Sequence, residues 1–374
     1  MKLDLYVELE VLRRKDMLYL TLVLAFIASI VLTPIVKRIA FRVGAVDRPN
    51  YRKVHARIMP RLGGLAIFGS FVIGYFILRP EETVSNAVDA AFIPISTAIL
   101  IGAVLITVTG VLDDMFEITA KAKLFGQLAA AAIVVVGGGL EISFINLPFG
   151  GELDFGYFSI PLTILWIVGI TNAINLIDGL DGLAAGVSTI ALVTLAIMAF
   201  IMGDPFVMSL AAILAASSIG FLFYNFHPAK IFMGDTGALF LGFMISVLAL
   251  MGFKNVTVVA LIIPIIMLGV PISDTFFAIV RRVREKQSIS AADKSHLHHC
   301  LLNIGFSHRQ TVLIIYGIAA LFGLAALLFS QATLWGGILL LGVMLLAIEL
   351  FVEVVGLAGK NYRPLINLVK FIGK

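Results

Sequence analysis

The sequence predicts an all-α polytopic integral membrane protein with about 11 transmembrane helices and a small periplasmic or extracellular hairpin. Of its 374 residues, 60% are hydrophobic and only 13% are charged, whereas a soluble domain carries about a quarter charged residues. Apolar runs long enough to cross a bilayer, which takes about 20 residues, recur along the chain. The lysines and arginines are also distributed unevenly between alternate loops, as expected for a multi-pass protein.

These runs divide the chain into an N-terminal extramembrane segment over 1–16, one transmembrane domain over 17–353 and a tail over 354–374. No A-x-A-like cleavage site follows the first span, 17–36, so we interpret it as a retained anchor and not a signal peptide. The Gly-rich stretch 138–158 predicts the small hairpin. The other spans are predicted at 62–79, 92–112, 122–137, 159–177, 182–202, 207–226, 237–253, 256–280, 311–329 and 333–353.

The positions of the basic residues predict which side of the membrane each loop occupies. One set of loops and the tail hold 21 of the 27 lysines and arginines, so we place them in the cytoplasm. This set also contains all six histidines and consists of 37–61, 113–123, 171–182, 225–236, 281–310 and 354–374. Topology therefore explains the net charge of +4, and no nucleic-acid partner is expected. The lone Cys300 excludes an intramolecular disulfide.

Four polar side chains recur at every third position between two apolar runs: Asn172, Asn175, Asp178 and Asp181. Neighbours three apart lie one above another on a helix. Carboxylates at the end of a membrane span are costly and so indicate function. The alternative interpretation is a helix end closed by two Asp-Gly pairs.

A pair of carboxylates, Asp113 and Asp114, closes the third predicted span. Adjacent carboxylates repel one another, so one of them tends to hold its proton or to lie near a cation. This arrangement suits a general base or a metal neighbour, although an interfacial helix end remains the alternative. Lys123 opens the next span and offers positive charge to a phosphate.

The segment Gly234–Gly237 begins another predicted span. A helix N-terminus favours anions, and glycine leaves room for a phosphate. Asp235 in this position suits a ligand for Mg²⁺ held between carboxylate and phosphate oxygens. The alternative is that Asp235 only caps the helix.

Two basic segments complete the cytoplasmic side. In the loop 46–64, Arg52, Lys53 and His55 suit anionic lipid headgroups or a phosphorylated substrate. The paired glycines of Pro60–Gly64 permit close backbone approach.

A histidine cluster follows a run of arginines later in the chain. His296, His298 and His299 suit phosphate binding as protonatable imidazoles. A zinc site is disfavoured, because the chain has one cysteine and its other polar motifs are rich in oxygen.

The order of these motifs resembles that of the polyprenyl-phosphate N-acetylhexosamine-1-phosphate transferases, of the glycosyltransferase family 4 type. The resemblance runs from about residue 30 to about residue 325. It rests on Asp113–Asp114, Asn172–Gly182, Phe232–Asp235 and His296–His299. The loop Asp47–His55 and the order His-Leu-His-His resemble the branch that starts teichoic acid, O-antigen or common-antigen synthesis. The peptidoglycan branch carries three consecutive histidines. Ala238 departs mildly from the pattern, where serine is frequent.

The resemblance implies transfer of N-acetylglucosamine 1-phosphate, or a related N-acetylhexosamine 1-phosphate, from a UDP-sugar to undecaprenyl phosphate, with release of UMP. It implies Mg²⁺, or Mn²⁺ in its place, and a homodimer. It also implies a multi-pass protein of the bacterial cytoplasmic membrane with its active site facing the cytoplasm.

Roles also follow from the resemblance. Asn175 and Asp235 match the residues that hold Mg²⁺ on the donor diphosphate. Asp178 and Asp181 match aspartates of the nucleotide pocket. The remaining matches are Asn225 and Phe232 on uracil, Asp113 and Asp114 as base or acceptor-phosphate ligands, and Lys123, His296, His298 and His299 near phosphate. Asn172, Arg52 and His55 complete the expected substrate-binding set.

Three other functions compete with this one. A phospho-N-acetylmuramoyl-pentapeptide transferase is the alternative within the family. An ion-coupled transporter would place charges near the bilayer midplane and show repeated halves, whereas here the charges gather at one surface. An intramembrane aspartyl protease would need a partner for Asp235 within a neighbouring span, and it would leave the basic loops unexplained.

Overall fold

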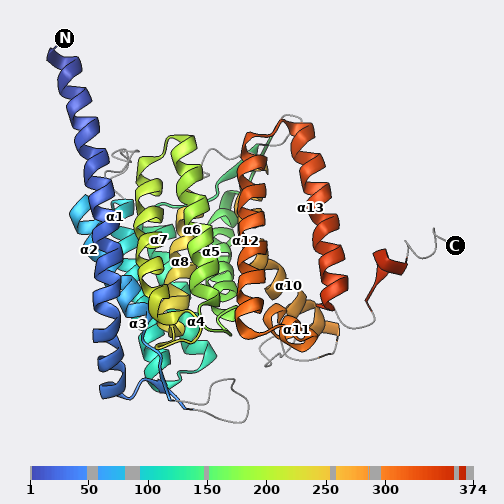
Figure 1. Cartoon of the computed structure of the whole chain (residues 1–374). Helices are drawn as coiled ribbons and strands as arrows, with labels where there is room; N and C mark the ends of the chain where they lie inside the picture. Colours follow the sequence, from blue (N-terminus) through green and yellow to red (C-terminus); the bar gives the residue numbers. More distant parts are fainter. Residues whose placement is uncertain are drawn as a thin grey trace. The chain divides into compact units, whose positions relative to one another are not determined.

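The computed structural model describes residues 2–48, 58–80, 93–146, 151–252, 258–284, 286, 296–357 and 362–367. These residues are mostly helical, and their strands form two small two-stranded sheets. The chain divides into two compact units, which are described separately (Figure 1). The first unit comprises 1–143 and 155–254, and the second comprises 144–154 and 255–374.

The first unit is a helical bundle around one buried helix, α8 (Gly234–Gly252). Every residue from Thr236 to Leu250 is buried, which agrees with a segment that is apolar on all sides. The other helices of this unit are α1 (Lys2–Val43), α2 (Gly64–Leu78), α3 (Ile95–Phe116), α4 (Ala120–Ala132), α5 (Ser159–Leu176), α6 (Leu183–Met202) and α7 (Pro205–Asn225). A π-helical turn, η1 (Ile133–Gly137), extends α4, and the 3₁₀ turn η2 (Gly156–Phe158) precedes α5.

A short antiparallel pair, β1 (Val46–Asp47) and β2 (Met59–Pro60), closes the base of the loop between α1 and α2. α1 is continuous across residues 16 and 17, where we predicted a boundary between a polar segment and the first span. It reaches beyond its neighbours α2 and α7 (Figure 1).

The second unit contains β3 (Phe144–Asn146) and β4 (Glu152–Asp154), which pair antiparallel with Phe144 opposite Asp154. The hairpin predicted over 138–158 is therefore present. The helices of this unit are α9 (Val258–Met267), α10 (Gly269–Arg284), α11 (Leu297–Ile304), α12 (His308–Gln331) and α13 (Leu334–Val355). α12 packs against each of the other four helices (Figure 1).

Within the described residues, nine helices are long and apolar enough to cross a membrane, which confirms an all-α polytopic membrane protein. The predicted count of eleven is not confirmed. The span predicted at 62–79 is the 15-residue helix α2, and the span predicted at 256–280 consists of α9 and α10. Pro271 explains this break, because proline has no N–H to donate to Met267 and its ring clashes with that carbonyl.

Glycines bring two helices, α2 and α3, onto the first turn of α8. A Cβ on Gly64 would lie 2.0 Å from the backbone nitrogen of Gly237. A Cβ on Gly110 of α3 would lie 2.5 Å from the Cα of Thr236. The close backbone approach predicted for the paired glycines before α2 is therefore confirmed, and α2 and α3 both press on the start of α8.

Gly234, the first residue of α8, adopts a left-handed conformation with φ of +70°. A Cβ there would lie 2.0 Å from the carbonyl oxygen of Arg61 and 2.4 Å from Oδ2 of Asp114. We expect Gly234→Ala to be strongly destabilising, because it adds a backbone collision to the strain of a positive φ. The strain alone costs about 1–2 kcal/mol, and overpacking adds about 1–3 kcal/mol.

Gly203 supplies the matched control, since its φ is +75° and a Cβ there would meet nothing within 4 Å. Thermal unfolding of the purified protein in detergent should show a much larger fall in Tm for Gly234→Ala than for Gly203→Ala. Equal falls would contradict the collision.

Candidate active site

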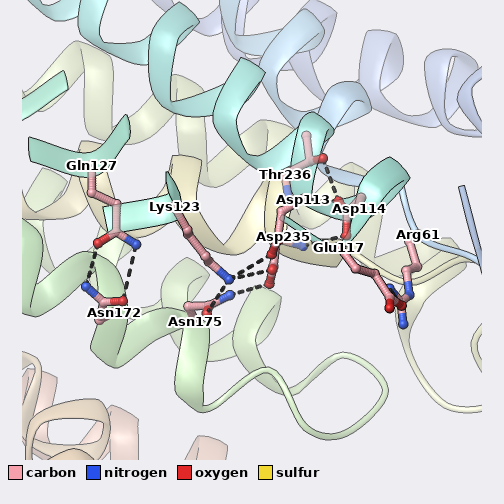
Figure 2. A network of polar contacts seen from close by, with 10 residues as sticks. All are labelled: Arg61, Asp113, Asp114, Glu117, Lys123, Gln127, Asn172, Asn175, Asp235 and Thr236. Carbon is pink, nitrogen blue, oxygen red and sulfur yellow. Dashed lines mark hydrogen bonds and ion pairs between the residues drawn. The ribbon is translucent and has the colours of Figure 1, made fainter. Parts of the chain in front are cut away.

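Four helix ends bring a lysine, two carboxylates and an amide together in the first unit (Figure 2). Lys123 Nζ, near the start of α4, donates to Asp235 Oδ2 at 2.5 Å and to Asp113 Oδ2 at 3.0 Å. It also donates to Asn175 Oδ1 at 3.2 Å. Asp113 comes from the end of α3, Asn175 from the end of α5 and Asp235 from the start of α8. Residues up to 122 positions apart in the sequence, Asp113 and Asp235, therefore form one polar cluster.

Asp235 is fixed from two sides. Asn175 Nδ2 donates to its Oδ1 at 2.6 Å, while Lys123 bonds to the other oxygen. Asp235 does not cap α8, because the first-turn N–H groups of that helix are directed at Asp114. Of the two interpretations that the sequence left open, the structure therefore removes the helix cap.

The adjacent carboxylates of the Asp113–Asp114 pair point to different partners (Figure 2). Asp114 is buried and accepts from the backbone N of Asp235 at 3.0 Å. It also accepts from the backbone N and Oγ1 of Thr236, at 2.9 and 2.6 Å. Only Asp113 turns toward Lys123.

The cluster offers a donor set that suits a hard divalent cation. Oxygen atoms from Asp113, Asn175 and Asp235 surround a single positive group, the ammonium of Lys123. Mg²⁺ prefers carboxylate and amide oxygens and usually takes only one or two carboxylates from the protein. The residues present therefore fit the magnesium ion that the sequence predicted.

A reciprocal pair of amides lies beside the cluster and links α4 to α5. Asn172 Nδ2 donates to Gln127 Oε1 at 2.7 Å, and Gln127 Nε2 donates to Asn172 Oδ1 at 3.2 Å. Asn172 also donates to the carbonyl of Val168 at 2.8 Å. Asn172, predicted to bind substrate, thus holds two helices together in this structure.

The three-residue periodicity beginning at Asn172 does not continue as a helix. α5 ends at Leu176, so Asp178 and Asp181 lie in the loop that leads to α6. The reason is local: the chain turns through Gly179, and Gly182 has φ of +77°. These Asp-Gly pairs form the helix end that the sequence left as an alternative interpretation, and they redirect the two carboxylates.

Asp181 fastens this loop to the segment after α7. It accepts from the backbone N of Ala229 at 3.1 Å, and its Oδ2 lies 2.8 Å from His227 Nδ1. Asp178 is electrostatically coupled to the main cluster. Burial, followed by the negative charges of Asp235, Asp114 and Asp181, raises the pKa of Asp178 to about 8.

The segment before α8 is held by a backbone ladder to the entrance of α2. Phe232 N donates to the Pro60 carbonyl at 2.8 Å, and Gly63 N donates to the Phe232 carbonyl at 3.0 Å. Gly64 N donates to the Met233 carbonyl at 2.9 Å. The Phe232 backbone is thus fixed while its side chain stays partly exposed.

Asn225, predicted to contact the nucleotide base, is buried at the end of α7. Its Nδ2 donates to the Ile231 carbonyl at 2.9 Å, which closes the 225–231 loop.

At the base of the α1–α2 loop, Arg61 forms a salt bridge with Asp47 and a longer one with Glu117 at 3.5 Å. Burial opposes the charge of Arg61, but the nearby carboxylates, Asp47 first and then Asp114 and Glu117, together outweigh it and raise the pKa of the guanidinium. Arg52 and His55 lie outside the described residues.

The second unit brings the predicted histidines together around a buried aspartate. Asp274 of α10 lies 2.8 Å from His296 Nδ1 and accepts from the backbone N of Leu297 at 2.7 Å. The rings of His296 and His298 are stacked, with centroids 6.0 Å apart, and the ring of His299 lies 4.2 Å from that of His298. Burial, and then the neighbouring His299, lowers the pKa of His298 to about 3. His298 is therefore neutral near pH 7.

Sequence reasoning missed Gln127, Thr236 and Asp274. Gln127 and Asp274 each stand within a predicted apolar span, where a polar side chain is costly and therefore informative. Thr236 carries no comparable signal, because a threonine at the start of a helix is ordinary.

The helices and this cluster define a polytopic membrane protein whose polar site is built from helix ends. Residues 96–253 match the model of glycosyl transferase family 4. A probable undecaprenyl-phosphate N-acetylglucosaminyl 1-phosphate transferase from Bacillus subtilis (strain 168) is 49% identical, over 94% of this chain and 97% of the relative. The chain belongs to glycosyl transferase family 4.

Relatives of lower identity also match most of this chain. A decaprenyl-phosphate N-acetylglucosaminephosphotransferase from Mycobacterium tuberculosis (strain ATCC 25618 / H37Rv) is 37% identical, over 82% of this chain and 83% of the relative. An undecaprenyl-phosphate alpha-N-acetylglucosaminyl 1-phosphate transferase from Yersinia pestis is 26% identical, over 88% of this chain and 89% of the relative. The similarity therefore extends over most of the length of each protein.

The raised pKa of Asp178 predicts a pH dependence of stability. Between about pH 4 and pH 8 the native state keeps a proton that the unfolded state loses, so stability falls as pH rises through this window. Asp178→Asn removes this slope. The Tm of Asp178→Asn minus the Tm of wild type, both measured in detergent with EDTA, should increase from pH 5 to pH 9. A difference that stays constant across this range would contradict the raised pKa.

Proposed function

We propose that this protein transfers N-acetylglucosamine 1-phosphate from its UDP-sugar to undecaprenyl phosphate, giving undecaprenyl-diphospho-N-acetylglucosamine and UMP. The observation that carries the proposal is the cluster of Lys123, Asp113, Asn175 and Asp235, in a chain 49% identical to a relative that bears this name. The distribution of basic residues supports a cytoplasmic site in a bacterial cytoplasmic membrane.

The chemistry explains why such a cluster is needed. An oxygen of the acceptor phosphate attacks the phosphorus that bears the sugar, a new P–O–P linkage forms, and the bond to UMP breaks. Both reactants are anionic, so positive charge must offset their repulsion. Lys123 supplies part of this charge at the point where four helix ends meet.

A magnesium ion would add to this charge and align the two phosphates. Asp235 and Asn175 would hold it, with Asp113 at the same point. The second ionisation of a phosphate monoester lies near pH 6, so the acceptor is largely ionised at neutral pH. Asp113 therefore needs only to orient the acceptor or remove its last proton, and direct attack is favoured over a covalent aspartyl intermediate.

A UMP-release assay with the purified protein in detergent tests the function. UMP should appear only when a UDP-sugar and a polyprenyl phosphate are both present. A donor panel of UDP-N-acetylglucosamine, UDP-N-acetylgalactosamine and UDP-N-acetylmuramoyl-pentapeptide separates the proposal from the peptidoglycan branch. No UMP release with any of these donors would refute a transferase and revive the transporter alternative.

Asp235→Asn should abolish transfer while the protein still inserts and purifies, because the substitution removes the ligand charge and keeps the volume. The measurement is UMP release over a range of Mg²⁺ concentrations. Asp204→Asn is the control: Asp204 caps α7 through the backbone N of Val207, and asparagine caps a helix nearly as well. Near-normal turnover of Asp235→Asn in excess Mg²⁺ would show that Asp235 is not a ligand.

Phe232→Ala should mainly raise the KM for the donor, by roughly ten- to a hundredfold, because stacking on a base contributes about 1–3 kcal/mol. The backbone ladder at Phe232 does not use the ring, so the segment should keep its position. Phe232→Tyr, which keeps an aromatic face, should behave nearly like wild type. A raised KM for the acceptor with an unchanged donor KM would overturn the assignment to uracil.

A further inference from the structure

The side chains of two adjacent aspartates in a helix point in different directions. Successive side chains of an α-helix point about 100° apart. Asp113 and Asp114 both belong to the last turns of α3, so one can face the cluster while the other faces a different neighbour. Figure 2 shows this divergence.

Asp114 faces the start of α8, where helix N–H groups lack partners within their own helix. Its Oδ1 accepts from Asp235 N, and its Oδ2 accepts from Thr236 N and Thr236 Oγ1. The side chain is buried, with 6% of the residue exposed. Three donors at 2.6–3.0 Å direct both oxygens of this carboxylate at the first turn of α8 and not at Lys123.

The backbone around Asp114 approaches it closely, which agrees with its role as a cap. Gly234 approaches so closely that an added Cβ would lie 2.4 Å from Asp114 Oδ2. Gly110, one turn earlier in α3, makes the same close approach to Thr236. α3 and α8 are therefore joined by backbone contact and by the carboxylate together.

The residue capped by Asp114 is the one that enters the cluster. The N–H of Asp235 bonds to Asp114, while the side chain of Asp235 bonds to Lys123 and Asn175. A shift of the first turn of α8 would therefore move the Asp235 carboxylate. Asp113 bonds directly to Lys123 and is the member of the pair that lies within the cluster.

We propose that Asp114 is a positioning residue that caps α8 from α3 and so fixes Asp235, and that Asp113 alone of the pair contacts the reacting groups. The part of this proposal that concerns catalysis rests on the proposed transferase function. The part that concerns the cap does not, because it is a property of α3 and α8.

The charged groups around the pair are contributed by several elements. Arg61 from the entrance of α2, Asp178 from the loop after α5 and Asp235 from α8 interact electrostatically with Asp114. Lys123 from α4 and Asp235 surround Asp113. The pH profile of UMP release must therefore be compared between a variant of Asp113 and a variant of Asp114, because the two positions share these surroundings.

The first experiment is amide hydrogen exchange of the full-length protein in detergent, followed in peptides that cover the start of α8. Asp114→Ala should accelerate exchange of the Asp235 and Thr236 amides by roughly tenfold or more, the factor expected for a lost cap. Asp113→Asn is the matched control and should leave these amides unchanged. Thr236→Val, which removes only the hydroxyl donor, tests the same contact if Asp114→Ala does not fold, and Thr236→Ser should restore it.

The second experiment compares pH profiles of UMP release. Asp113→Asn should recover part of its activity as pH rises from 6 to 8, because the acceptor phosphate then completes its own ionisation. Asp114→Asn should show no recovery, because its defect is the position of Asp235.

Unchanged exchange at α8 in Asp114→Ala, or recovery of Asp114→Asn at high pH, would overturn the proposal. If wild type released no UMP, the transferase function would fail, and the exchange data would still decide whether Asp114 is the cap.

Discussion

The buried contact between Asp114 and the first turn of α8 fixes the geometry on which the site depends. The first turn of α8 is largely buried from Thr236 onward, and a buried N–H without a partner costs about 1–3 kcal/mol. A carboxylate from α3 satisfies two of these donors and a hydroxyl. The positive end of the helix dipole also favours a carboxylate at this position. The glycines at this crossing, Gly110 and Gly234, are what allow the backbones to come close enough.

In the second unit, an aspartate also caps the start of a helix from a neighbouring helix. α11 begins at Leu297, and its first N–H bonds to Asp274 of α10, which also orients the ring of His296. In both units an aspartate on one helix caps the start of another, and the capped segment presents a functional candidate. The sequence offers no direct sign of this relationship, because cap and helix lie 23 and 121 positions apart. Such caps hold a polar site in place although the capping residue is distant in the sequence from the helix that it caps.

Composition and patterning were sufficient for the fold class and the close approach at Gly64, because each follows from a local property of the chain. The helix end at the Asp-Gly pairs was one of two interpretations that the sequence left open. The division of roles between Asp113 and Asp114 was beyond the sequence, since it depends on which distant helix each side chain meets. The continuation of the Asn172 periodicity failed for a local reason, namely that an Asp-Gly turn ended α5 before Asp178 was reached. Here turn chemistry overrode a three-residue repeat.

The charges of the cluster favour the divalent cation that we propose for this site. Lys123 carries one positive charge, while Asp113 and Asp235 together carry two negative charges when ionised, so the group by itself is net negative. A net negative group repels the phosphates of both proposed substrates. Asp235 and Asn175 would hold the proposed magnesium ion, whose two positive charges would make the group net positive and suit it to anions.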